Sequence, residues 1–452
     1  MALKQMDALA ALREAAGEVI ETSLCDVQGS WLALVNTEEG KRLAFAAKGE
    51  AALSALWKDV EKEADVKDVH VSVMALNANN AALVRRYVKW TAPTACGTKG
   101  ASIGFSDWLG EADAVVAELF GKRQLKPVLV DFTTEDSEAL QRYFVQAVDT
   151  ATWGVLEEGY KEGYGANAAG LKTEEEIVKA LLYGYSMIGF DCSDKIDLGI
   201  EKLSDEAVDK RFEQFNETFR AALHASYLNS EFKVGTSKIT FTENQLHRIV
   251  LEYGEAIMHI QFIYNSYLKN TPWDIDFELD LSKPGKVLTP QEHYLIGNEL
   301  QRNGIKLSSI CLDPLKDSEA VNDNLQLHCE IADTFGYRLS FKNADIAMND
   351  TAAAMKYLKG KVHFKMNNIL WMSAIELVKA LDADLFGKLC AACGFEATAD
   401  AADRALVLGY RKALNPKEES NVAADMKAFL EAHHAEYAAA IKENVAAKLK
   451  NI

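Results

Sequence analysis

Carboxylate, ammonium and amide side chains recur directly after the short apolar runs of this 452-residue chain. Several carboxylates with one or two imidazoles would suit a divalent metal ion, and a nearby lysine could hold a substrate carboxylate. Taken singly, an aspartate at a strand end is more simply a turn former or a helix cap. The recurrence after five or more expected strands is what predicts a site. The residues are Asp107, Asp131, Asp191, Asp194, Lys195, Asp280, Asp313, Lys342, Asn343, Asp345, Lys365 and Asn367.

Residues 273–300 join one of these strand ends to the start of a helix. Residues 274–281 alternate polar and apolar types, which predicts a strand. After a polar loop, Thr289-Pro290-Gln291-Glu292 has the pattern of a capping box, with His293 one turn into the helix. A cap and a satisfied helix histidine would explain this segment as well as a site would. As a site, it would present Asp280, Ser282 and His293 to a ligand.

From about residue 100 onward, short apolar runs alternate with helical patterns, which is typical of βα units around a parallel sheet. Eight such runs predict a (β/α)8 barrel of the TIM type, whose strand ends converge on one face. A doubly wound open sheet is the alternative. The expected strands are residues 102–105, 127–132, 186–191, 273–281, 305–312, 337–341, 361–364 and, more weakly, 405–410.

The chain divides into three expected parts. Residues 1–95 resemble a small α/β unit with an N-terminal helix, a hairpin at 31–46, a helix at 51–63 and a strand at 69–74. Residues 96–414 would form the barrel, with two long helices (205–228 and 243–268) as an insertion at about 200–270. Residues 415–452 would add a C-terminal helix on the outside of the barrel.

Composition narrows the function classes. The formal net charge of −18 argues against nucleic acid or an anionic membrane as the main partner, and the chain has no apolar run of about 18 residues that could span a bilayer. Seven scattered cysteines predict reduced thiols and a cytoplasmic location. Cys390 and Cys393 are more simply packed thiols than a redox or zinc pair. The glycines between 159 and 170 resemble helix C-caps, not a phosphate loop.

Several motifs, in the same order along residues 100–390, resemble the tagaturonate/fructuronate epimerase family. They are Ile103-Gly104-Phe105-Ser106-Asp107, the segment 149–173, Asp191-Cys192-Ser193-Asp194, Thr289-Pro290-Gln291-Glu292-His293-Tyr294 and Gly360-Lys361-Val362-His363-Phe364-Lys365. The resemblance implies a barrel enzyme that uses a divalent metal to invert C4 of a keto-uronate. It would place Asp107, Asp280, His293, His363 and Lys365 in the pocket.

With the resemblance, the strand-end residues receive expected roles. Asp107 and His293 would be catalytic, and the metal, an ion of Mn, Ni, Zn or Co, would be held by Asp280, His293 and His363. The sugar acid or ketose substrate would contact Asp194, Lys342, Lys365 and Asn367. Because the C4 hydrogen of a 2-keto sugar is not adjacent to the carbonyl, retro-aldol cleavage and re-addition is the economical route. That route needs an electrophile and an acid/base group.

Departures from the family pattern keep two other functions open. Asp280-Leu281-Ser282 lacks the family's glutamate, and Lys342-Asn343-Ala344-Asp345 lacks its imidazole. One alternative is therefore a barrel that has lost catalysis and binds a sugar acid or a partner protein. The other is a lyase or isomerase in which Lys342 or Lys365 forms a Schiff base.

Overall fold

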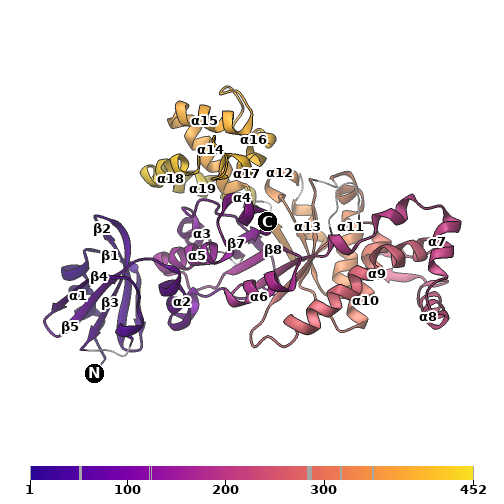
Figure 1. Cartoon of the computed structure of the whole chain (residues 1–452), viewed down its shortest axis with the longest axis horizontal. Helices are drawn as coiled ribbons and strands as arrows, with labels where there is room; N and C mark the ends of the chain where they lie inside the picture. Colours follow the sequence, from indigo (N-terminus) through magenta and orange to yellow (C-terminus); the bar gives the residue numbers. More distant parts are fainter. Residues whose placement is uncertain are drawn as a thin grey trace.

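The computed structural model describes residues 2–49, 53–121, 123, 125–281, 288–315, 318–348, 351–450 and 452. Its centre is a closed barrel of eight parallel strands in the order β12-β13-β14-β15-β6-β7-β8-β9 (Figure 1). The closed sheet confirms the predicted (β/α)8 class and excludes the open doubly wound alternative. The strands are β6 (Ser102–Gly104), β7 (Lys126–Thr133), β8 (Gly165–Leu171), β9 (Met187–Asp191), β12 (Asp276–Asp280), β13 (Ser309–Leu312), β14 (Arg338–Phe341) and β15 (Val362–Lys365).

The structure corrects the predicted strands in two places. Residues 405–410 are helical, because they contribute to α16 (Arg404–Leu408) and α17 (Tyr410–Ala413). The missing strand is β8, whose sequence Gly-Ala-Asn-Ala-Ala-Gly-Leu has little β propensity and lay in the glycine region interpreted as caps. Close packing explains its small side chains, since a Cβ atom on Gly165 would lie 2.9 Å from both Cys96 Sγ and Val128 Cγ2.

Helices surround the barrel, and several of them pack directly against its strands. The capping box at the start of α10 is confirmed: Glu292 N donates to Thr289 Oγ1 at 3.3 Å, and Thr289 N donates to Glu292 Oε2 at 2.7 Å. Ser282 lies outside the described residues. The helices are α3 (Asp113–Phe120), α4 (Thr134–Leu140), α5 (Phe144–Glu158), α6 (Glu174–Leu182), α10 (Pro290–Arg302), α11 (Ser318–Phe335), α12 (Ala344–Ala347), α13 (Thr351–Tyr357) and α14 (Ile369–Leu381).

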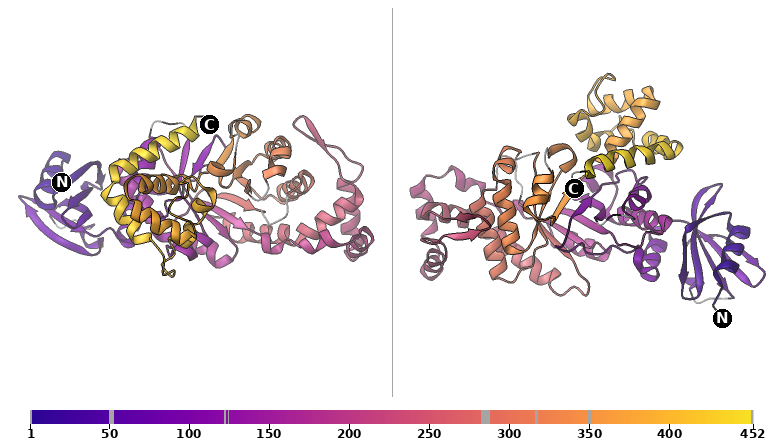
Figure 2. Two further views of the ribbon diagram at one scale, coloured as in Figure 1. Left: turned by 90° about the horizontal axis from the view of Figure 1, so that it is seen from above. Right: turned by 180° about the vertical axis from the view of Figure 1, so that it is seen from behind.

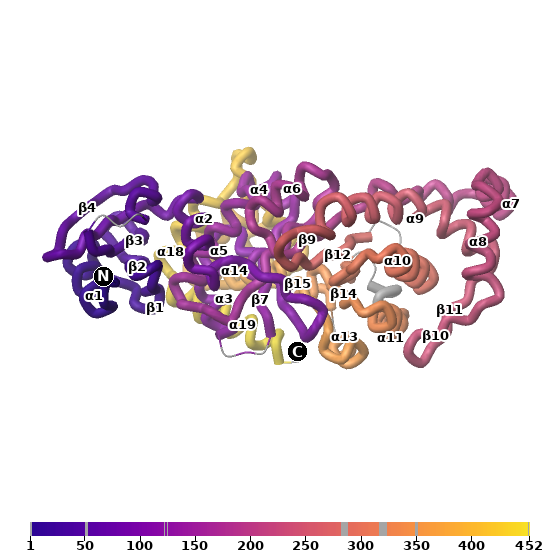
Figure 3. The backbone as a smooth tube through the Cα atoms, turned by 90° about the horizontal axis from the view of Figure 1, so that it is seen from below, coloured from indigo at the N-terminus to yellow at the C-terminus, as the bar shows by residue number. Residues whose placement is uncertain are grey.

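A helical insertion between β9 and β12 extends from one end of the molecule (Figures 1 and 3). Its first expected helix is divided in two, because Asn216 caps a new helix by accepting from Thr218 N at 2.8 Å. The insertion consists of α7 (Asp205–Phe212), α8 (Glu217–Tyr227), the hairpin β10 (Phe232–Val234) and β11 (Ser237–Ile239), and α9 (Glu243–Ile263) with its π-helical end Tyr264–Leu268. Helix α9 packs against α10 and so anchors the insertion to the barrel.

At the opposite end, the N-terminal residues form an antiparallel sheet in the order β1-β2-β3-β5-β4. The helix expected at 51–63 is wrong where it is described, because Val60–Val66 is the charged edge strand β4. One face packs on α1 (Gln5–Ala16), and the other packs on α2 (Ala78–Tyr87) and on α5 of the barrel. The sheet also contains β1 (Glu18–Val27), β2 (Ser30–Thr37), β3 (Gly40–Lys48) and β5 (Val69–Met74).

The C-terminal helices stack on one another beside the barrel (Figure 2). The single helix expected near the end is two, α18 (Ala423–Ala432) and α19 (His434–Leu449), which are separated at His433. Helix α19 packs against α14 and α3. Cys390 and Cys393, at the end of α15 (Ala383–Cys393), are free thiols, of which Cys390 is buried and Cys393 is half-buried.

Candidate active site at the barrel mouth

A cavity of about 670 Å³ lies at the carboxyl ends of the barrel strands. Because this end of a barrel carries the βα loops, side chains from strands far apart in sequence meet there. Of the residues that were given expected roles, four line the cavity together: Asp280, Lys342, Lys365 and Asn367. Other strand ends contribute Asp131, Gly170, Asp191 and Asp313.

Lys342 and Asp280 form an ion pair in the cavity wall, with 25% and 10% of their side chains exposed. Asp280 ends β12, and Lys342 directly follows β14. Burial lowers the pKa of Lys342, but the adjacent Asp280 carboxylate outweighs burial, so the pKa is raised above its ordinary value. The lysine is therefore a fixed ammonium at neutral pH.

A second ion pair lies deeper in the barrel. Lys365 Nζ donates to Glu278 Oε1 at 2.5 Å and lies 3.8 Å from Asp131 Oδ1. Burial tends to raise the pKa of Glu278, but the Lys365 charge reverses this and lowers it. Burial dominates at Asp131, whose pKa rises to about 6 although Lys365 opposes the shift. Glu278 was missed in the sequence, although it lies two residues before Asp280 and so shares its strand face.

His363 supports this pair from below and does not line the cavity. Its Nδ1 atom lies 2.9 Å from Ser102 Oγ, and its Nε2 atom lies 4.0 Å from Asp131 Oδ2. Burial, only partly opposed by Glu278, lowers the pKa of His363 to about 3, so the ring is neutral. Arg338, also fully buried, donates to the same Ser102 Oγ at 2.8 Å.

His293 is not among the described residues that line the cavity. It is fully buried on the outer layer, where its Nδ1 atom is 2.9 Å from His328 Nδ1 and its Nε2 atom is 2.9 Å from Tyr337 Oη. Burial lowers the pKa of His293 well below its ordinary value, and that of His328 to about 4. The ring faces α11 because the rotation of α10 turns position 293 away from the strand ends.

Asp107 and Asp194 likewise lie outside the described cavity lining. Asp107 accepts from the backbone N–H groups of Gly110 at 2.8 Å and Ala112 at 2.6 Å, so its carboxylate orders the loop that leads into α3. Asp194 stands at the rim with 68% of its side chain exposed, 3.1 Å from Lys172 Nζ. Lys172 itself lines the cavity.

Helix α17 supplies a wall that sequence reasoning missed. Tyr410 Oη donates to Asp136 Oδ1 at 2.5 Å, Arg411 Nε donates to the same atom at 2.9 Å, and the Tyr410 ring stacks on Trp108 with centroids 3.4 Å apart. The signal was Asp403, which caps α16 by accepting from Ala405 N and marks a helix where a strand was expected.

The cavity is acidic overall. Its described lining includes eight carboxylates, against the four cations Lys172, Lys342, Lys365 and Arg411. An anionic ligand therefore depends on local cations and not on the general field.

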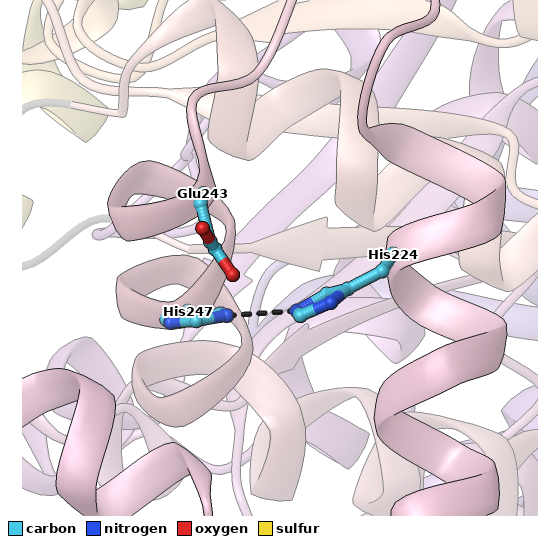
Figure 4. Close-up of side chains that lie close together, drawn as sticks. All are labelled: His224, Glu243 and His247. Atoms are coloured by element: carbon cyan, nitrogen blue, oxygen red, sulfur yellow. Dashed lines mark hydrogen bonds between the residues drawn. The ribbon is translucent and has the colours of Figure 1, made fainter.

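The described residues at the mouth do not fit the expected divalent ion. Within the described ranges, Asp280, His293 and His363 do not form a group with mutually close ligand atoms, and two ammonium groups stand beside the carboxylates. The described part of the chain offers such a group elsewhere, in the insertion: His224, Glu243 and His247, whose ligand atoms lie within 4.8 Å of one another (Figure 4). Sequence reasoning missed it, although Glu243 and His247 have the i, i+4 spacing of one helix face.

Comparison with known proteins agrees with the fold and the motifs. The family model for tagaturonate epimerase matches residues 20–436. A tagaturonate/fructuronate epimerase from Thermotoga maritima is 28% identical over 383 residues, which cover 82% of this chain and 78% of that protein. Two crystal structures of a fructuronate-tagaturonate epimerase from Cohnella laeviribosi, both glycerol complexes, superpose with a TM-score of 0.85. They are 24% and 25% identical and cover 97–98% of this chain and 98% of theirs. No described helix is long and apolar enough to cross a bilayer. By the match along most of its length, the chain belongs to the tagaturonate epimerase family.

Proposed function

We propose that the chain interconverts the keto sugar acids tagaturonate and fructuronate by inverting C4 in the cavity at the barrel mouth. The observation that carries the proposal is the Lys342–Asp280 ion pair, which lies in the cavity wall of a barrel from an epimerase family. Relatives from Thermotoga maritima and Cohnella laeviribosi are named for the same two sugar acids.

The chemistry starts at the C4 hydroxyl. Loss of its proton lets the electrons of the C3–C4 bond move to the C2 carbonyl, which gives an aldehyde and an enediolate. We assign the proton acceptor to Asp280 and the stabilisation of the enediolate oxygen to Lys342. The aldehyde then rotates, the C3–C4 bond forms again on its other face, and the proton returns to the C4 oxygen.

The positive charge of the two lysines favours this electrostatic role over the formation of a Schiff base. The pKa of Lys365, like that of Lys342, is raised: burial would lower it, but Asp131 and Glu278 outweigh burial. A protonated amine has no lone pair with which to attack a carbonyl. The same ammonium groups oppose a metal ion, so no step is assigned to one at the mouth.

The substrate carboxylate needs a cation that is open to solvent. Lys172 and Arg411 line the cavity with 42% and 40% of their side chains exposed. We therefore assign the carboxylate to one or both of them. Seven free cysteines support a reducing compartment, the cytoplasm, as the place of the reaction.

The test is direct. Purified protein is incubated with tagaturonate and, separately, with fructuronate in D₂O, and the products are followed by proton NMR. We expect the C4 epimer with its C4 proton retained, because bond cleavage between C3 and C4 never removes that hydrogen. Absence of any epimer would refute the function, and deuterium at C4 would refute the cleavage route.

A further inference from the structure

The insertion brings an imidazole of α8 into contact with an imidazole of α9. His224 Nε2 lies 2.9 Å from His247 Nε2, and Glu243 lies one turn before His247 on the same helix face (Figure 4). His247 is buried, His224 is half-buried and Glu243 is exposed. The group therefore has a closed inner side and an open outer side.

We propose that His224, Glu243 and His247 bind a transition metal ion of the Zn²⁺ type. Two imidazole nitrogens and a carboxylate oxygen are the ligands of many zinc sites with one open position. Imidazole ligands favour zinc, nickel, cobalt or copper over calcium and magnesium, which prefer oxygen. The exposed Glu243 gives the ion a route from solvent.

The residues around the imidazoles support this assignment. His247 Nδ1 lies 2.7 Å from Asp209 Oδ1 on α7, so the Nδ1 proton is donated to this carboxylate and the Nε2 lone pair points at His224. Metal-ligating histidines are typically fixed in this way by a carboxylate behind the ring. Phe212 stacks on His247 with centroids 3.8 Å apart and shields the inner side from water.

A hydrogen bond between the two rings would pair an N–H group of one ring with the nitrogen lone pair of the other. Glu243 takes no part in that hydrogen bond. Figure 4 shows the Glu243 carboxylate pointing toward the gap between the two rings. Two nitrogens about 2.05 Å from a tetrahedral ion lie roughly 3.3 Å apart. The rings would separate by a few tenths of an ångström, a movement that His224 can make from its half-buried place on α8.

Such an ion would connect three helices that are consecutive in the insertion. It would bind α8 through His224 and α9 through Glu243 and His247, while Asp209 extends the connection to α7. The site is separate in sequence and in residues from the barrel mouth, so it is a structural clamp and not part of the proposed epimerisation.

The experiment uses untagged full-length protein, because a histidine tag would bind the same ions. After treatment with a chelator and dialysis, Co²⁺ is titrated and followed by its visible absorption, and Zn²⁺ competition is measured by calorimetry. We expect one Co²⁺ per chain, displaced by Zn²⁺. His224→Ala should abolish binding, Glu243→Gln should weaken it at least tenfold, and Asp209→Asn should weaken it about 10–100-fold.

His434→Ala, on the exposed start of α19, is the matched control and should bind like the parent protein. Circular dichroism checks that each variant is folded, and Glu243→Gln remains informative if a histidine variant is not. No Co²⁺ bound at millimolar concentration would overturn the site. So would unchanged binding in both His224→Ala and Glu243→Gln, which would locate the ion elsewhere. Neither result depends on substrate, so the clamp and the epimerase fail or stand separately.

Discussion

The barrel mouth and the contact between α8 and α9 differ in the source of their positive charge. At the mouth, the cations are side chains: Lys342 is paired with Asp280, and Lys365 with Glu278, in a wall that excludes most solvent. At the α8–α9 contact, the residues that meet are two imidazoles and an exposed carboxylate. The first arrangement holds a permanent charge, and the second suits an exchangeable one.

The difference shows why nearness of polar atoms does not define a metal site. The His293–His328 pair has the same 2.9 Å separation between ring nitrogens as the His224–His247 pair. Yet His293 is fully buried against Tyr337, while His247 has Asp209 behind it and Glu243 at the open side. The carboxylates and the access to solvent distinguish a ligand pair from a packing pair.

Removal of the permanent charge at the mouth should have the largest effect. Lys342→Gln should lower kcat for epimerisation about 10²–10³-fold, the typical cost of losing one electrostatic stabiliser. The measurement is steady-state kinetics with tagaturonate. Lys417→Gln, at an exposed position, is the control. A Lys342→Gln enzyme with parental kcat would remove this lysine from the mechanism.

The buried histidine pair predicts a stability effect without a catalytic one. His293→Leu leaves the Tyr337 hydroxyl and a His328 nitrogen without their partner, at roughly 1–3 kcal/mol each. We expect the free energy of unfolding to fall by about 2–6 kcal/mol in denaturant titrations, while kcat/KM of the folded protein stays within about threefold. A much larger kinetic loss would return His293 to the catalytic set.

The exchangeable charge at the insertion predicts stabilisation by metal. Zn²⁺ at 100 times its Kd should raise the free energy of unfolding by about 2.7 kcal/mol, because it binds the folded state. His224→Ala should lose this increment, whereas His434→Ala should keep it. An equal increment in both variants would mean that the ion stabilises the protein through another site.

The buried His328 ring also predicts a pH dependence of stability. Burial lowers the pKa of His328 to about 4, whereas an unfolded histidine has a pKa near 6.5. Between these values the unfolded state binds more protons, so stability is lost as the pH falls, by about 1.4 kcal/mol per pH unit. Asp131, with its pKa raised to about 6, opposes this slope.

A comparison of His328→Phe with the parent protein isolates the contribution of His328 to the pH dependence of stability. Denaturant midpoints are measured from pH 4 to pH 7 for both proteins. The variant should show a shallower loss of stability on acidification. Parallel curves for the two proteins would show that His328 does not titrate in this window.

Local sequence patterns were enough to predict the barrel and the place of its mouth. Alternating βα patterns and polar residues after the strands predicted the closed parallel sheet and the convergence of Asp280, Lys342, Lys365 and Asn367. The capping box at Thr289 could also be predicted, because its hydrogen bonds join residues three positions apart in the sequence. Strand β8 could not be predicted, because its small residues are required by close packing against neighbours such as Cys96 and Val128 and follow no local pattern.

Which of these side chains lie together depends on contacts that form only when distant elements pack. The rotation of α10 turned His293 toward His328, and barrel closure paired Lys342 with Asp280 across 62 positions of sequence. The folding of the C-terminal helices brought Arg411 to Asp136, and the packing of α8 on α9 brought His224 to His247. A local pattern reports contacts within one or two turns, whereas these pairs exist only after distant elements have packed.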